Sequence, residues 1–502
     1  MPTVPLPDNP NLDQLRKQAR DLQRAVRAGD EAALALVREH GRDRGLGPSG
    51  FPLASAQLVI ARRHDFASWP KLRHYVQVIA ARSWDPDAPR PAEEPLADRF
   101  LRMACLTDSR NPAADLASAA RLLADHPQLP ALSLPVAAAC ADVASVRRQL
   151  AADPSLAAAA AGPHGWSPLL YQAYSRHDPR GGRAAALQTS RLLLAAGADP
   201  DDGRFWRGLP TPFTVLTGVL GGGERAQPGH PHSIPLARLL LEAGADPNDG
   251  QALYNRMFGT SDDHLVLLLE FGLGRGAGGP WHRLLGDQLQ SPQVMLRNLL
   301  AWAVTHDQRE RVALLARSGV DVVSPVTELR GRGPRARTPA EHALVNGHRE
   351  LAEMLVGLGA ARPRLGPADA FVAAVLAGDV DAVRQTAPAV VSAVRRSRAG
   401  LVTWAAGQGA PASVLLLAAA GFDVNAFGRS DVPSNERWHT ALHVAAERGD
   451  LALARQLLDL GADPDLPDKH YRSTPLGWAR HFGQQPVIDL LEPVTAPPLP
   501  SG

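Results

Sequence analysis

The sequence predicts an all-α solenoid of stacked helix-turn-helix repeats with projecting loops, preceded by a small helical N-terminal region. The first observation is a recurring phrase in which a run of leucines is followed by a glycine, a small residue and often aspartate and proline. The second is its spacing, because repetition at intervals of roughly 30 to 50 residues is typical of solenoids. Clear copies are centred on Gly197, Gly244 and Gly461, and weaker ones on Gly272, Gly319, Gly359 and Gly421.

One repeat unit shows why these residue types recur. Thr440 is suited to capping a helix, because its hydroxyl can accept from the unpaired amides of the first turn. Gly449 can adopt the left-handed conformation that ends this first helix. An apolar stripe then predicts a second helix that ends at Gly461, and its members are Leu451, Ala454, Leu457 and Leu458. Each unit is therefore a helix pair with a projecting loop, and only neighbouring units can cover its apolar face.

These residues resemble ankyrin repeats. The matches to the family's Thr-Pro-Leu-His and Gly-Ala-Asp-Pro-Asn signatures are closest at 440–465 and 474–491 and good at 167–200, 211–248 and 338–360. Looser units keep only the helix pattern, at 96–125, 132–153, 369–379 and 401–409. The resemblance implies an ankyrin-type array of about ten or eleven repeats over residues 91–492. It also implies that His443 ties adjacent loops together.

The array is irregular. At several places the glycine spacing exceeds the family's period of about 33 residues, which indicates insertions in the loops at 203–210, 221–233, 328–337 and 427–439. We interpret residues 280–294 as an added helix instead. The most irregular part of the array is therefore expected at residues 200–300.

Residues 1–90 differ from the repeats and predict a helical leader. A helical stripe ends at Gly29-Asp30, and its members are Leu12, Leu15, Ala19, Leu22, Ala25 and Val26. Further helices are expected at 31–40 and 53–64. The leader resembles a helical segment found ahead of some bacterial ankyrin arrays. We expect it to cap the apolar face of the first repeat, and a separate binding function is the alternative. Residues 493–502 are expected to form a disordered, proline-rich tail.

Composition and charge argue against several functions. The net charge is +2 and 21% of residues are charged, whereas phosphate-driven binding of nucleic acid normally shows a stronger basic excess. Only the arginine-rich loop at 330–337 keeps that function open. No apolar run reaches the roughly 18 residues of a membrane span, and residues 1–10 lack the pattern of a signal peptide. The protein is therefore expected in the cytoplasm, and the scarcity of lysine among its basic residues indicates a GC-rich bacterial source.

Candidate catalytic, metal and cofactor sites are incomplete. His230 and His232 could bind a metal, but no nearby cysteine or carboxylate completes a recognisable set. The glycine-rich segments 221–223 and 272–276 lack the strand, helix and lysine of a phosphate-binding loop. Both cysteines, Cys105 and Cys140, lie in predicted alanine-rich helices and are expected to be reduced and buried. We therefore expect no enzyme activity, no metal and no cofactor.

The loop tips that precede the first helix of many units combine aromatic residues with arginine. Such tips line one edge of a solenoid, and tryptophan, tyrosine and arginine dominate the energy of protein interfaces. The tips therefore predict a partner-binding surface, and its candidate residues are Trp166, Arg204, Phe205, Trp206, Arg207, Tyr254, Trp281, His282, Arg335, Arg337, Arg437, Trp438, Tyr471 and Arg472. The alternative is that each ring packs on a neighbouring loop and each arginine pairs with a local aspartate.

The predicted function is a non-enzymatic scaffold or adaptor that binds a partner protein or peptide through its loop tips and concave helix face. The alternative is a small-molecule-binding or enzymatic site in the irregular repeats at 200–300. The residues that could enclose it are Trp206, Tyr254, Arg256, Trp281 and His282. Because ankyrin arrays share one framework and bind unrelated targets, the resemblance itself names no partner.

Overall fold

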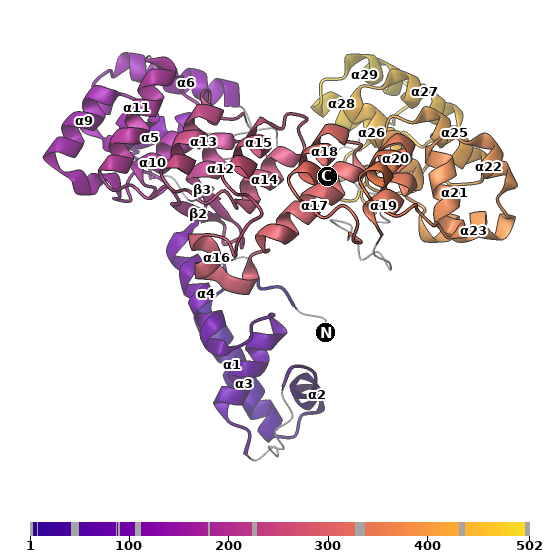
Figure 1. The fold of residues 1–502 in the computed structure, drawn as a ribbon, viewed down its shortest axis with the longest axis horizontal. Coiled ribbons are helices and arrows are strands. Elements are labelled where there is room, and N and C mark those ends of the chain that lie inside the picture. Colours follow the sequence, from indigo (N-terminus) through magenta and orange to yellow (C-terminus); the bar gives the residue numbers. More distant parts are fainter. Residues whose placement is uncertain are drawn as a thin grey trace. The chain divides into compact units, whose positions relative to one another are not determined.

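The computed structural model describes residues 4–7, 9–41, 50–86, 88, 91–105, 112–178, 181–222, 228–326, 337–430 and 437–496, and most of them are helical (Figure 1). The chain divides into two compact units, residues 1–295 and 296–502, which are described in turn. Within the described residues, every helix is too short or too polar to cross a membrane.

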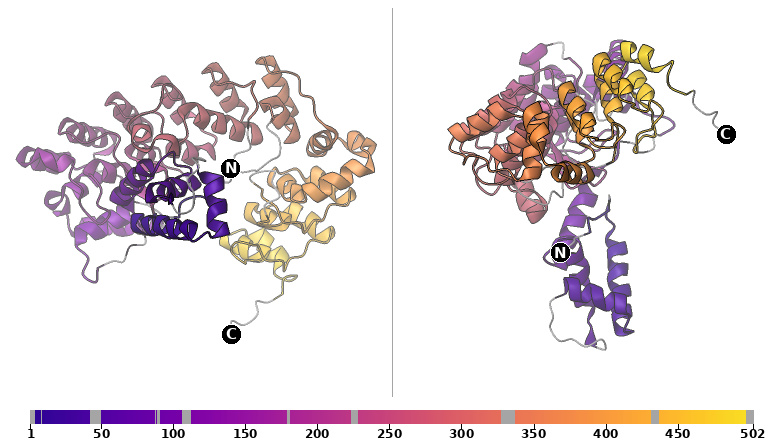
Figure 2. Two further views of the ribbon diagram at one scale, coloured as in Figure 1. Left: turned by 90° about the horizontal axis from the view of Figure 1, so that it is seen from below. Right: turned by 90° about the vertical axis from the view of Figure 1, so that its right-hand side faces the viewer.

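The leader helices lie side by side at the start of the first unit (Figures 1 and 2). They are α1 Leu12–Arg27, α2 Glu31–His40, α3 Leu53–Arg63 and α4 Trp69–Arg82. The stripe predicted from the sequence forms the buried face of α1, and α3 packs against α1, α2 and α4. Asn11, Asp30 and Ser68 begin three of these helices, and each side chain accepts from a first-turn amide. The leader is therefore helical, as its periodicity predicts.

The loop predicted at 203–210 belongs in part to a small sheet. Strands β2 (Gly203–Trp206) and β3 (Pro212–Thr214) pair in antiparallel fashion. Strand β1 (Ser83–Trp84), at the end of the leader, pairs in parallel with β2, so that Trp84 lies opposite Trp206. The all-α prediction misses these strands, because segments this short carry too few residues to show an alternating pattern.

The leader packs on this sheet and on the inserted helix α16 (Pro280–Leu285). Its apolar core continues into Phe205 and Trp281, whose side chains are buried. His74 Nε2 also donates to the Leu284 carbonyl at 3.2 Å. The expectation that the leader caps the first repeat is therefore corrected. The two insertions, the small sheet and helix α16, project beyond the helix pairs. They carry apolar side chains of their own, and the leader covers these side chains.

The rest of the first unit consists mainly of helix pairs that pack on one another. Their elements are α5 Leu96–Ala104, α6 Pro112–Asp125, α7 Leu129–Leu132, α8 Leu134–Ala139, α9 Val143–Ala152, η2 Pro154–Ala157, α10 Pro168–Tyr174, α11 Gly182–Ala195, α12 Val215–Leu220, α13 Ser233–Glu242, α14 Gly250–Met257 and α15 Asp263–Glu270. The first helices α8, α10, α12 and α14 pack in succession, and the second helices α9, α11, α13 and α15 form a matching row. Each pair thus covers its neighbour, as a repeat framework requires.

The added helix expected at 280–294 is shorter than predicted. Helix α16 begins at Pro280 and is followed by a single 3-10 turn, η4 Gly286–Gln288. Gly286 ends the helix with a φ of 59°, a left-handed conformation that favours glycine. Residues from Pro292 onward belong to the next long helix, α17 Pro292–Thr305.

The second unit also consists of paired helices. Its elements, after α17, are α18 Arg309–Arg317, α19 Pro339–Val345, α20 Arg349–Gly357, α21 Pro367–Leu376, α22 Val380–Gln385, α23 Pro388–Ser397, α24 Leu401–Gly407, α25 Pro411–Ala419, α26 Ala441–Arg448, α27 Leu451–Asp459, α28 Pro475–His481 and α29 Gln485–Leu491. The first helices α24, α26 and α28 pack in succession around a core that includes Trp404 and Leu442.

The repeat at 440–465 has the local chemistry that its sequence predicts. Gly449 ends α26 with a φ of 67°. The Thr440 amide donates to His443 Nδ1 at 3.2 Å, so the ring proton lies on Nε2, which donates to the Ser473 carbonyl at 3.0 Å. Burial lowers the pKa of His443 to about 4, which keeps the ring neutral at pH 7. His443 therefore links its own helix to the next projecting loop, as the ankyrin resemblance implies.

Cys105 and Cys140 are buried free thiols, as expected. They lie just beyond the last residues of α5 and α8 rather than inside these helices. The Cys105 thiol donates to the Tyr171 carbonyl at 3.5 Å, and burial raises its pKa. Both residues are thus part of the core.

The loop between α27 and α28 is organised by Asp468, which is fully buried. Its carboxylate accepts from the backbone amides of His470, Tyr471 and Ser473 and from Trp478 Nε1. Burial alone would raise the pKa of Asp468, but these hydrogen bonds favour the ionised form and lower the pKa below its usual value. The carboxylate therefore fixes the backbone of this loop.

Asp468→Ala should lower the free energy of unfolding by about 2 to 3 kcal/mol, because it leaves several donors without their acceptor. Urea denaturation followed by circular dichroism measures the loss. Asp463→Ala, an exposed position in the same loop, is the matched control and should cost about 0.5 kcal/mol or less. Equal effects of the two substitutions would contradict the role assigned to Asp468.

Candidate functional site

In the first unit, two loop tips meet the end of the leader at Trp84. The centroid of its ring lies 5.0 Å from that of Trp166 and 5.1 Å from that of Trp206. Trp84 Nε1 donates to His164 Nδ1 at 2.9 Å. Burial lowers the pKa of His164 to about 3, so the imidazole is neutral at pH 7 and its Nδ1 can accept this bond. The aromatic tips are therefore covered from within the chain.

Three candidate binding residues of this unit lie in the interior. Trp166 and Phe205 are 2% and 0% exposed. Phe205 packs edge-to-face on Trp281, with ring centroids 5.4 Å apart, and the Arg82 guanidinium lies 5.2 Å from the centre of the Trp281 ring. Trp166, Phe205 and Trp281 are accordingly removed from the proposed partner surface, because their large apolar areas are already buried.

The arginines of the same tips pair locally. Arg204 donates to Asp202 Oδ1 at 2.6 Å, and Arg207 Nε donates to Asp85 Oδ1 at 3.2 Å. The Arg207 amide also donates to the Trp84 carbonyl at 2.8 Å. The tips of this unit therefore fit the alternative stated for the sequence: their rings pack on neighbouring loops, and their arginines pair with nearby aspartates. They do not form an open surface. The sequence prediction did not include Trp84. The only feature of the sequence that could have indicated its role is its position just before the proline-rich segment 85–95.

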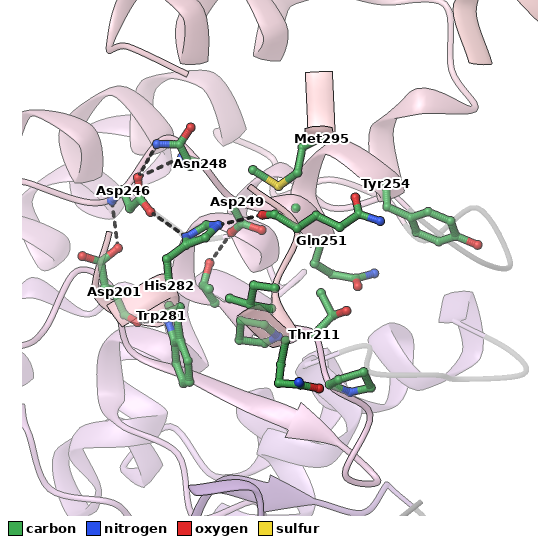
Figure 3. A pocket seen from close by; sticks show the side chains of 17 residues that line it. Asp201, Thr211, Asp246, Asn248, Asp249, Gln251, Tyr254, Trp281, His282 and Met295 are labelled. Carbon is green, nitrogen blue, oxygen red and sulfur yellow. Dashed lines mark hydrogen bonds and ion pairs between the residues drawn. The ribbon is translucent and has the colours of Figure 1, made fainter. Parts of the chain in front are cut away.

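Beside these strands, the irregular repeats enclose a cavity of about 450 Å³ (Figure 3). Asp201, Asp246 and Asp249 line it, together with the candidate residues Trp281 and His282. Three of the five residues expected around a pocket here therefore do line one, namely Tyr254, Trp281 and His282. Trp206 packs edge-to-face on Trp84 instead, and Arg256 pairs with Asp263 at 3.0 Å.

Tyr254 lies at the rim of this cavity. Its ring packs edge-to-face on Phe258, with centroids 5.2 Å apart. In Figure 3 the Tyr254 ring points away from the three carboxylates. The tyrosine therefore borders the cavity without contributing its hydroxyl to the acidic part.

Asp249 has a structural role as the N-cap of α14. Its carboxylate accepts from the hydroxyls of Thr214 and Thr217 and from the Ala252 amide. Burial raises the pKa of Asp249, although these hydrogen bonds act in the opposite direction. Its lone pairs are thus largely occupied by the protein itself.

Asp246 and Asp201 are the other two carboxylates that line the cavity. Asp246 Oδ1 accepts from Asn248, and Oδ2 accepts from the Gly279 amide at 2.7 Å. Asp201 Oδ1 accepts from the Asp246 amide at 2.8 Å. Burial raises the pKa of Asp201 to about 6, and the neighbouring carboxylates of Asp199, Asp246 and Asp249 push it in the same direction. Asp201 is therefore a carboxylate whose negative charge is poorly compensated.

The tips of the second unit form an aromatic cluster around the partly buried Trp438. The Trp438 ring centroid lies 4.9 Å from that of His470 and 6.4 Å from that of Tyr471. The Arg429 guanidinium lies 4.8 Å from the centre of the Trp438 ring, a cation–π arrangement. Tyr471 is 67% exposed. We call Arg437, Trp438, His470, Tyr471 and Arg472 the C-terminal tip cluster.

Two of the candidate arginines of the second unit belong to this cluster, and a third forms an ion pair. Arg437 and Arg472 are exposed. Arg337 instead donates to Asp369 at 3.0 Å and its side chain is mostly buried, so it is removed from the proposed surface. Arg335, and most of the arginine-rich loop at 330–337, lie outside the described residues.

The candidate metal site at His230 and His232 is explained by packing. Burial lowers the pKa of His230 to about 3, and its Nδ1 accepts from the His232 amide at 3.0 Å. Among the residues that the structure describes, no group of three histidine, cysteine or acidic side chains is arranged to hold a metal ion.

One of these regions is similar to a known family. Residues 437–469 match the Ankyrin repeat family. The matched span runs from Arg437 of the C-terminal tip cluster through α26 and α27, and it contains Thr440, His443 and Gly449. No curated protein matches the sequence.

Trp84→Ala should release the end of the leader from the loop tips, because the ring fills the space between Trp166 and Trp206. Hydrogen exchange measured by mass spectrometry should show the segments around residues 83–86 and 203–207 exchanging about tenfold faster or more. Tyr471→Ala, on an exposed ring of the other unit, is the control and should leave both segments unchanged. Unaltered exchange in Trp84→Ala would show that the ring does not hold the strands together.

Asp201→Asn keeps an oxygen acceptor for the Asp246 amide and removes a carboxylate charge that burial disfavours. The folded-state pKa of about 6 lies above the ordinary value of 3.8, so the folded wild type binds extra protons and gains stability as the pH falls from about 6 to 4. The variant should therefore be more stable than the wild type by about 1 kcal/mol at pH 7.5, after solvent screening, and should lose this advantage at pH 4. Thermal denaturation at the two pH values tests this, and an equal difference at both would contradict it.

Proposed function

We propose that the chain is a non-enzymatic scaffold whose helix pairs form an ankyrin-type solenoid, and that it binds a protein or peptide partner through the C-terminal tip cluster. Ankyrin repeats serve in protein–protein interaction, and the matched repeat at 437–469 carries part of this cluster. The successive packing of first helices on first helices within each unit supports the solenoid. The adjoining face of α24, α26 and α28 would supply the rest of the contact.

The exposed Tyr471 ring is the observation that carries the proposal. A tyrosine with 67% exposure contributes little to the core, and exposed arginines stand beside it. Tyrosine and arginine are residues on which interface energy concentrates. The backbone beneath this ring is held by Asp468, so the ring is presented on an ordered loop and binding loses little conformational entropy.

The tips of the first unit differ, because Trp84 already occupies the space between Trp166 and Trp206. We therefore assign the partner surface to the second unit alone. A second candidate function, a small-ligand site, is favoured by the acidic cavity of the first unit and is developed below.

The double variant Tyr471→Ala/Arg472→Ala tests the partner surface. The immobilised wild-type chain is used to capture proteins from a native lysate, and the captured proteins are quantified by mass spectrometry. The specific partner should decrease about tenfold or more in the variant, since an interface anchor is often worth about 2 kcal/mol. Tyr254→Ala, at the cavity rim of the other unit, is the matched control and should retain the partner. If the variant is folded by circular dichroism and captures the same proteins, the surface lies elsewhere.

A further inference from the structure

We propose that the cavity at residues 201–295 binds a small organic cation, namely an ammonium group carried on a short apolar stem. This site lies beyond the partner surface proposed above and belongs to the other unit. The cavity is lined by the carboxylates of Asp201, Asp246 and Asp249, and none of its lining residues is lysine or arginine. Its carboxylates therefore have no matching positive charge among the lining residues.

Two of these carboxylates have acceptor capacity that the described residues leave unused. Asp201 uses Oδ1 for the Asp246 amide, and no described residue donates to its Oδ2. Asp246 Oδ2 accepts one bond, from the Gly279 amide, and a carboxylate oxygen can accept two. A positively charged donor in the cavity would complete both carboxylates and compensate the charge that burial leaves on Asp201.

His282 provides an independent observation. Its side chain is 9% exposed, and Nδ1 is a buried atom without a hydrogen-bond partner among the described residues. Nε2 donates to the Gln290 carbonyl at 3.0 Å, so Nδ1 is the ring nitrogen that is left without a partner. This nitrogen lies 3.8 Å from Asp246 Oδ2, and Figure 3 shows the two side chains facing each other at the cavity.

An ammonium group supplies a positive charge and up to three hydrogen-bond donors to the carboxylates of the cavity, whereas a neutral hydroxyl supplies one donor and no charge. The carboxylates and the imidazole do not form a metal-ion arrangement among the described residues. The chemistry of the acceptors therefore favours an organic cation.

The remainder of the wall suits an apolar stem. Pro212, Leu289 and Met295 line the cavity beside the Trp281 ring, whose Nε1 is already engaged with the Asp201 carbonyl at 2.8 Å. A cavity of about 450 Å³ lies within the range of small-ligand sites. A ligand that places its amine against Asp201 and Asp246 would thus rest its carbon chain on these side chains.

Isothermal titration calorimetry of the full-length chain with pentylamine and 1,5-diaminopentane tests the proposal, with 1-pentanol as the uncharged analogue. The amines should bind saturably and the alcohol should bind at least about tenfold more weakly, because it lacks the charge. In Asp201→Asn the amine affinity should fall about tenfold or more. This variant keeps the acceptor for the Asp246 amide and is expected to be more stable than the wild type at pH 7.5, so a loss of binding would not reflect unfolding.

Two further variants separate the site from general electrostatics. Asp287→Asn removes an exposed carboxylate on the same insertion, outside the cavity lining, and should leave amine binding unchanged. Gln251→Lys places an ammonium group of the chain itself at the cavity and should abolish amine binding. The proposal is overturned if the wild type binds neither amine, if 1-pentanol binds as well as pentylamine, or if Asp201→Asn and Asp287→Asn have equal effects. None of these outcomes bears on the partner surface, which is tested with Tyr471.

Discussion

Coverage of each helix pair's apolar face by the next pair is the interaction on which the rest of each unit depends. Small side chains such as Ala445 and Ala446 let neighbouring helices approach closely, and large ones such as Trp404 fill the space between pairs. A regular array satisfies this requirement with its own units. An insertion does not, because its apolar residues project beyond the framework. In the first unit the leader meets that need, since Phe205 and Trp281 belong to the same core as α1, α3 and α4.

The same residue types therefore have different roles in the two units. Around Trp84, tryptophan and arginine side chains of the loop tips complete an internal contact, with rings in edge-to-face pairs and arginines on local aspartates. Around Trp438, the Tyr471 ring and Arg472 remain exposed on a loop that a buried carboxylate holds in place. The residue types show that these tips could take part in recognition. Whether they can contact another molecule depends on whether another part of the chain already covers them.

The features that follow from local chemistry could be predicted from the sequence, and those that depend on distant pairing could not. The cap at Thr440, the helix end at Gly449 and the bridge from His443 each rest on residues a few positions apart. Strand β1 has two residues and pairs with a segment more than a hundred positions later, so neither periodicity nor turn chemistry predicts it. The acidic cavity was equally hidden, because Asp201, Asp246 and Asp249 each resemble ordinary loop or cap residues. Only the stacking of successive loops brings their carboxylates together.

The pairing of Ser83 with Phe205 also has a consequence for the order in which the chain folds. During synthesis the leader leaves the ribosome first, and at about 5 to 20 residues per second its strand partner follows only after several seconds or more. Trp281, which completes the same core, is synthesised later still. Helices α1 to α4 can form at once, but the aromatic face they share with the insertions stays uncovered until several repeats have been made. The N-terminal segment can thus become helical early in synthesis, whereas its final packing has to wait until Trp281 has been made.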